Sequence, residues 1–182
     1  MRAQQIFARA IFTARVLWGA LTFSCVLLGV VTVIVPSPVS HPPEESFVAI
    51  FAAVGFALAI ASFVLPARVY ANNVALVRVE KVEPEPTPDG PGPARFAHPE
   101  LAAGRAMGIA TTSLILSMAL SEAVGLLGLV LHMQGAPMTL SSAFIGAAVV
   151  LAAVRFPTVP RLVEPFERAK GASFAASEGG SY

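Results

Sequence analysis

Four long runs of apolar residues, separated by polar segments, dominate the pattern along this chain. The runs cover residues 16–35, 47–65, 106–131 and 138–154, and the only charged residue inside any of them is Glu122. Each run is close to or above the length that an α-helix needs to cross about 30 Å of hydrocarbon at about 1.5 Å per residue. The pattern therefore predicts an all-α membrane protein with four transmembrane helices.

The segments between the runs are polar or rich in proline. Residues 1–15 carry apolar positions at helical spacing, which predicts an amphipathic cytoplasmic extension of the first helix or a short surface-lying piece. Residues 36–46 and 132–137 form short outer loops. Residues 66–105 form a longer connection with a proline-rich linker, and a new helix is predicted to start near Pro99. Residues 155–182 contain several prolines and end in small polar residues, which predicts a disordered cytoplasmic tail.

Composition and charge agree with a lipid environment and assign an orientation. Hydrophobic residues make up 55% of the 182 residues and charged residues 13%, against roughly 25% charged residues in soluble domains. All 12 Lys and Arg residues fall in residues 1–15, 66–105 and 155–182. The positive-inside rule then predicts that both termini and the central connection face the cytoplasm. We interpret the chain as an integral protein of the bacterial inner (plasma) membrane.

The net charge and the position of the single tryptophan bear on the expected partners. A net charge of +1 gives no reason to expect nucleic acid. Trp18, close after Arg15, suits either an anchor at the level of the lipid headgroups or a role in packing. The expected partners are the lipid bilayer and either a second copy of the chain or another membrane protein.

Small residues predict where the helices pack. Lipid tails are as apolar as leucine, so membrane helices associate through the close backbone approach that small side chains allow. The third and second runs both carry such residues at short, regular intervals. We expect helix packing through Ser113, Ser117, Ser121, Gly125 and Gly128 on the third helix, and through Gly55, Ala57, Ala59 and Ala61 on the second.

Glu122 is the candidate functional residue. An ionisable side chain near the centre of a bilayer costs roughly 2.5 kcal/mol or more unless it is neutralised, paired or hydrated. Such a residue is therefore a candidate for a functional site. We expect Glu122 to be protonated or hydrogen-bonded at neutral pH, as an ion-binding group or as a structural one.

The sequence around Glu122 resembles a known family. The stretch Ala119-Leu120-Ser121-Glu122-Ala123, followed by Gly128-Leu129-Val130, is similar to the carboxylate-bearing helix of the c-subunit proteolipids of rotary ATP synthases. The alternation of small residues from Gly55 to Ala61 is similar to the pattern on that family's other helix. The resemblance covers under half of the chain and implies that Glu122 binds a proton. The chain differs from the family in its 40-residue connection and in its extra first and fourth helices.

Two functional hypotheses follow. The first is a non-catalytic membrane scaffold or accessory subunit, in which Glu122 is a structural hydrogen-bonding group. The second is a c-subunit-like proton-binding proteolipid that uses Glu122. We do not expect an enzyme, a cofactor or a metal site, because the sequence shows no nucleophile with a base, no cluster of metal ligands and no phosphate-binding loop.

Overall fold

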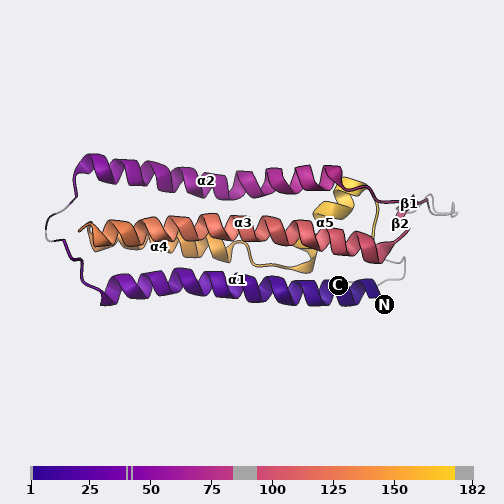
Figure 1. Ribbon diagram of the computed structural model, residues 1–182, viewed down its shortest axis with the longest axis horizontal. Helices are drawn as coiled ribbons and strands as arrows, with labels where there is room; N and C mark the ends of the chain where they lie inside the picture. Colours follow the sequence, from indigo (N-terminus) through magenta and orange to yellow (C-terminus); the bar gives the residue numbers. More distant parts are fainter. Residues whose placement is uncertain (1, 40, 42, 84–93, 175–182) are drawn as a thin grey trace. The chain divides into compact units, whose positions relative to one another are not determined.

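The computed structural model describes residues 2–39, 41, 43–83 and 94–174 and is all-α apart from one very short pair of strands. Three of its helices are long and apolar enough to cross a membrane, over Gln5–Ile34, Glu45–Leu76 and Pro99–Met133, and a fourth apolar helix is shorter. The chain is therefore built as an integral membrane protein. In chain order the elements are α1 (Arg2–Ile34), α2 (Glu45–Leu76), β1 (Lys81–Val82), β2 (Arg95–Phe96), α3 (Pro99–Met133), α4 (Met138–Ala153) and α5 (Val159–Lys170), labelled in Figure 1.

The chain divides into two compact units, and α1, α2 and α3 each contribute to both. The first, which we call the bundle unit, consists of Arg15–Ala67 and Leu114–Phe156. The second, which we call the mixed unit, consists of Met1–Ala14, Arg68–Ser113 and Pro157–Tyr182. The N-terminal piece is thus part of one unbroken helix, α1, rather than a separate surface-lying segment.

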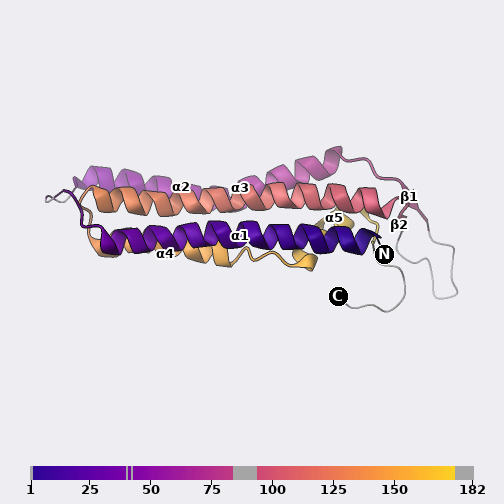
Figure 2. The same ribbon diagram turned by 60° about the horizontal axis from the view of Figure 1, so that its bottom comes forward.

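In the bundle unit, α4 packs against all three of the other helices, and Figure 2 shows it beside α1. Glycines on the neighbours make this possible. A Cβ added at Gly128 of α3 would lie 2.8 Å from both the Ser141 carbonyl oxygen and the Phe144 Cβ. One added at Gly55 of α2 would overlap the Phe144 ring, and one at Gly29 of α1 would touch Ile145. Close backbone approach, the contact that membrane helices depend on, therefore centres on α4.

The turn from α3 to α4 reverses the chain within a few residues. Gly135 has φ of 83°, and the amide of Ala136 donates to the Leu131 carbonyl at 3.0 Å while the Gly135 amide donates to the His132 carbonyl at 3.0 Å. This is a Schellman ending, which requires a residue with positive φ and favours glycine there. His132 Nε2 also donates to the Val35 carbonyl, at 2.7 Å, just beyond the end of α1. The turn is thereby tied to the first loop.

The mixed unit has an aromatic core. Phe166 of α5 is fully buried and lies close to Phe96 and Phe174, with ring centroids 5.8 Å and 6.2 Å away. Phe7 of α1 meets the Phe174 ring edge-on at 5.1 Å. The strands β1 and β2 pair antiparallel beside this core. The rest of the core comes mainly from α2 and α3, through Tyr70, Val74, Ala102, Ala106 and Ile109.

The prediction that residues 155–182 are disordered is wrong for α5. The helix starts after Thr158 with a proline in its first turn, and ends at Gly171, which has φ of 60°. Both are favourable helix-end signals, because the first turn does not need its N–H groups and glycine adopts positive φ at little cost. Leu162, Val163 and Phe166 are buried on one face. Docking of that face stabilises the helix although Pro165 lies inside it.

The connection between the second and third helices is also shorter than the sequence predicts. The helix α2 continues to Leu76, the strands follow, and α3 begins at Pro99, as predicted. The proline-rich linker at residues 84–93 lies outside the described residues. Ala106 and Ala110, assigned from sequence to the third span, are buried in the mixed unit. The first residues of the third apolar run are thus buried inside the mixed unit rather than in the bundle unit.

Candidate functional site

Glu122 lies inside the bundle unit with a hydrogen-bond donor from another helix. Ser24 of α1 donates its hydroxyl to Glu122 Oε1 of α3, and the Glu122 side chain is half-buried. Cys25, which follows Ser24, is buried with Val124 and Ala148 in the apolar core of the unit. The carboxyl group is therefore held against α1 of its own chain.

The hydrogen bond does not depend on the protonation state of Glu122. A carboxyl oxygen accepts from a hydroxyl both when the group is ionised and when it is neutral. A single hydroxyl does not replace the hydration shell of a carboxylate, and an unpaired charge buried in apolar surroundings is costly. The Ser24 hydroxyl supplies one such hydrogen bond and thereby links α1 to α3.

A second polar cluster, around Arg155, joins three helices of the bundle unit. The Nη1 of Arg155 donates to Ser121 Oγ at 2.5 Å and to the Leu151 carbonyl at 2.8 Å. Its Nη2 donates to the hydroxyl and the carbonyl of Ser62 at 2.7 and 3.0 Å. The guanidinium carbon lies 4.4 Å from the centre of the Phe63 ring. One side chain just after α4 thus binds both α2 and α3.

Arg155 is a charged group whose bonding partners are neutral. Within the described part of the chain, no carboxylate lies within ion-pair distance of it. Four N–H donations and stacking on an aromatic ring use the planar fork of arginine in a way that a lysine ammonium cannot reproduce. From the sequence, Arg155 is only one of the basic residues that indicate the orientation in the membrane. Nothing in the sequence shows that its side chain turns back toward Ser62 and Ser121.

The predicted packing residues of α3 lie mostly inside the bundle unit. Ser117, Ser121, Gly125 and Gly128 are buried, and Ser113 is half-buried in the mixed unit. Ser117 and Ser121 bond to carbonyls of their own helix, at 2.8 Å in both cases. Their hydroxyls are thus satisfied while their small size lets neighbouring helices approach.

The predicted packing residues of α2 do not all share one face. Gly55 is buried and Ala59 and Ala61 are half-buried, but Ala57 is exposed. Residues two apart on an α-helix point in nearly opposite directions, whereas residues four apart lie on one face. The packing face of α2 therefore follows Gly55 and Ala59, and Ser62 continues it.

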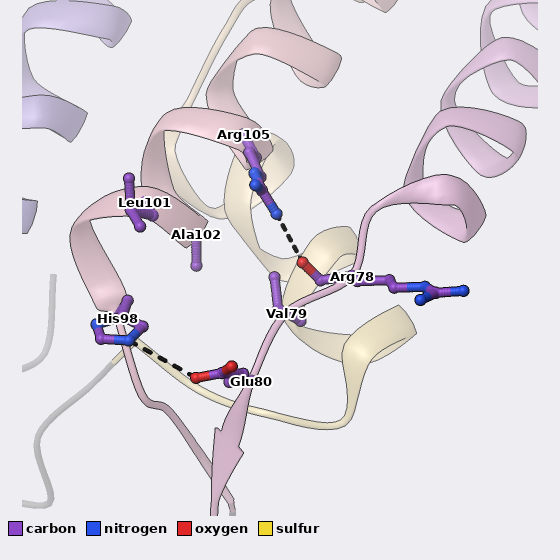
Figure 3. A pocket seen from close by; sticks show the side chains of 7 residues that line it. All are labelled: Arg78, Val79, Glu80, His98, Leu101, Ala102 and Arg105. Carbon is purple, nitrogen blue, oxygen red and sulfur yellow. Dashed lines mark hydrogen bonds and ion pairs between the residues drawn. The ribbon is translucent and has the colours of Figure 1, made fainter.

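An open pocket in the mixed unit, of about 380 Å³, lies beside the start of α3. Figure 3 shows the guanidinium of Arg105 directed at the Arg78 carbonyl, which accepts its hydrogen bond at 2.6 Å, and the Arg78 side chain pointing away. Glu80 and His98 are 3.7 Å apart, with their side chains 82% and 68% exposed. Such an exposed pair contributes little free energy. The cluster mainly holds the backbone that leaves α2.

Among the described residues, no three His, Cys, Asp or Glu side chains converge in a way that could hold a metal ion. No protein-family model, curated protein or solved structure matches the chain. The candidate functional residues are therefore Glu122 with Ser24, and Arg155 with Ser62 and Ser121.

Proposed function

We propose that this protein is a non-catalytic scaffold or accessory subunit of the bacterial inner membrane, with four membrane-spanning helices and with both termini and the central connection in the cytoplasm. Three long apolar helices support the membrane location. The confinement of all 12 Lys and Arg residues to three segments supports the orientation, since it places every one on the same side.

The fourth span needs its own argument, because α4 is short. Its 16 residues are about 24 Å long at about 1.5 Å per residue, less than the hydrocarbon thickness of about 30 Å. Its close contacts with Gly29, Gly55 and Gly128 on the three longer helices support a position among them. A hairpin with α3 that crosses back to the cytoplasm accounts for these contacts and for the basic residues that follow α4.

The observation that carries the scaffold proposal is the hydrogen bond between Ser24 and Glu122 within one chain. A carboxyl group bonded to its own bundle needs no ion to be satisfied, and it joins two helices that are distant in sequence. Together with Arg155 it supplies directional contacts where the hydrophobic effect does not hold helices together.

The alternative is a proton-binding proteolipid, which the half-buried state of Glu122 favours. Exchange with a second site requires that the carboxyl group be reached from outside the bundle. In that account many copies surround a common axis. In the scaffold account one or two copies suffice.

The test combines particle mass with carboxyl chemistry. We expect a detergent-extracted monomer or dimer, and we expect Glu122→Gln to change the free energy of unfolding by less than about 0.5 kcal/mol, because the Gln carbonyl still accepts from Ser24. Glu122→Asp, which shortens the side chain, is the matched variant and should weaken the contact. A ring-sized particle whose Glu122 reacts with an apolar carbodiimide, less strongly as pH rises, would overturn the scaffold proposal in favour of the proton carrier.

A further inference from the structure

Arg15 is an exposed cation at the edge of the bundle unit. It is the last charged residue of α1 before the uncharged run at residues 16–35. Its guanidinium carbon lies 5.5 Å from the centre of the Phe156 ring. Among the residues that the structure describes, no carboxylate lies within ion-pair distance of Arg15. Within this part of the chain, an aromatic ring rather than an ion pair therefore positions the charge.

The aromatic support under Arg15 is itself held in place. Trp18 meets the Phe156 ring edge-on, with centroids 4.9 Å apart and planes at 88°. The Trp18 indole Nε1 donates to the Ala152 carbonyl at 2.8 Å, one of the last carbonyls of α4. The same carbonyl also accepts from the Arg155 amide at 3.0 Å, so the indole is a second donor to it. Trp18 and Phe156 therefore form a fixed platform between α1 and the end of α4.

The surroundings of this platform define what can bind there. Val16 and Val154 are 55% and 54% exposed, one residue after Arg15 and two residues before Phe156. A guanidinium offers parallel N–H donors that match the oxygens of a phosphate, and aromatic rings are favoured at the boundary between lipid and water. A soluble anion would satisfy Arg15 but would leave the valines uncovered, whereas a phospholipid supplies both a phosphate and acyl chains.

We propose that Arg15, Phe156 and Trp18 form a binding site for the headgroup of an anionic phospholipid in the cytoplasmic leaflet. The site rests on the orientation given under the proposed function. Its occupant follows from charge complementarity and from continuity with the apolar surface that faces lipid. Stacking on Phe156 limits the orientations of the guanidinium, so less freedom is lost when the phosphate binds.

The only tryptophan of the chain lies in this site, so fluorescence reports on it alone. The full chain is reconstituted in two sets of phosphatidylcholine vesicles. One set contains a fixed fraction of phosphatidylglycerol brominated on its acyl chains, and the other contains the same fraction of brominated phosphatidylcholine. We expect brominated phosphatidylglycerol to quench Trp18 with a local preference of roughly fivefold, which corresponds to about 1 kcal/mol for a basic residue at an anionic surface. The ratio of the quenching by the two brominated lipids, taken within one variant, does not depend on the intrinsic fluorescence of that variant.

Three variants separate a built site from general attraction to the surface. Arg15→Lys keeps the charge but loses the stacked, planar fork, and we expect it to lose more than half of the preference, as should Phe156→Leu. Arg9→Ala removes a nearby exposed charge of the same helix and should keep the preference. Equal quenching by the two lipids in the wild type, or full preference in Arg15→Lys, would overturn the site. Quenching by neither lipid would instead contradict membrane insertion and so the proposed function.

Discussion

The bundle unit and the mixed unit bury different kinds of side chain. In the bundle unit, glycine and serine lie between the helices, while large apolar residues such as Phe23 and Phe56 are 62% and 70% exposed. In the mixed unit the large residues Phe96 and Phe166 are inside, at 5% and 0% exposure. The proposed membrane location of the bundle unit, with the mixed unit in water, accounts for the difference. Lipid gives apolar surface no reason to be buried and leaves close packing to small residues, whereas water drives aromatic rings into a core.

Cations are used in a similar way in both units. In the mixed unit, Arg105 and Lys170 each donate at 2.6 Å to the backbone carbonyls of Arg78 and Val77, just after α2 ends. In the bundle unit, Arg155 donates to carbonyls and hydroxyls of three helices. Basic residues near helix C-termini complement the helix dipole and satisfy carbonyls that lack partners. Several charges that the sequence assigns to membrane orientation therefore also fix the fold.

The largest effect should come from emptying the aromatic core of the mixed unit. Phe166→Ala removes a fully buried ring, and such substitutions cost about 3–5 kcal/mol. We expect α5 to detach and trypsin to cleave rapidly after Arg161 and Arg168, while the bundle unit stays folded. Phe12→Ala, at a side chain that is 71% exposed, is the matched control and should cleave like the wild type. Resistance of both variants to trypsin would show that the ring does not hold α5.

A smaller effect should follow from a methyl group between α3 and α4. Gly128→Ala places a Cβ 2.8 Å from the Ser141 carbonyl oxygen, and overpacking of this kind costs about 1–3 kcal/mol. Gly146→Ala is the control, because nothing lies within 4 Å of its added Cβ and alanine is the better helix former by about 1 kcal/mol. Thermal unfolding in detergent should move in opposite directions for the two variants. A shift in the same direction for both would remove the close α3–α4 contact from the account.

A still smaller loss is expected at Arg155. Arg155→Lys keeps the charge but replaces the two-nitrogen fork by one nitrogen with three N–H groups, so we expect a loss of about 1.5 kcal/mol in the free energy of unfolding of the bundle unit. Arg68→Lys, at an exposed position, serves as the control. An unchanged unfolding transition in Arg155→Lys would mean that its charge, rather than its four hydrogen bonds, is what matters there.

The sequence predicts the apolar helices well and the mixed unit poorly. Uncharged runs locate both ends of α4, the end of α1 and the start of α2 within two residues, and Pro99 marks the start of α3. The helices α1 and α2 extend well beyond their runs, to Arg2 and Leu76, because a helix can continue past the apolar segment. The sequence prediction misses α5 because prolines such as Pro165 normally interrupt a helix. The spacing of Leu162, Val163 and Phe166 and the glycine at residue 171 were available signals for an amphipathic helix.

The polar contacts could not be predicted in the same way. That Glu122 needs a partner follows from its position in an apolar run, but the choice of Ser24 depends on which face of α1 turns toward α3. The direction of Arg155 depends likewise on the packing of three helices. Ala57 is a different case, because it is predicted to pack and is exposed. Small residues at every second position do not form one face, since residues two apart on an α-helix point in nearly opposite directions.

The central claim is that lipid surrounds the bundle unit while the mixed unit lies in the cytoplasm, and cysteine accessibility tests it most directly. With Cys25 replaced by serine, single cysteines are placed at Val39 and Gln134, in the two loops that we propose lie outside, and at Leu76 and Ala169 in the mixed unit, all exposed. The account predicts that an impermeant maleimide labels Val39→Cys and Gln134→Cys in intact cells, and labels Leu76→Cys and Ala169→Cys only after the membrane is opened. Labelling of Ala169→Cys in intact cells would contradict the account, because the chain after α4 would then lie outside.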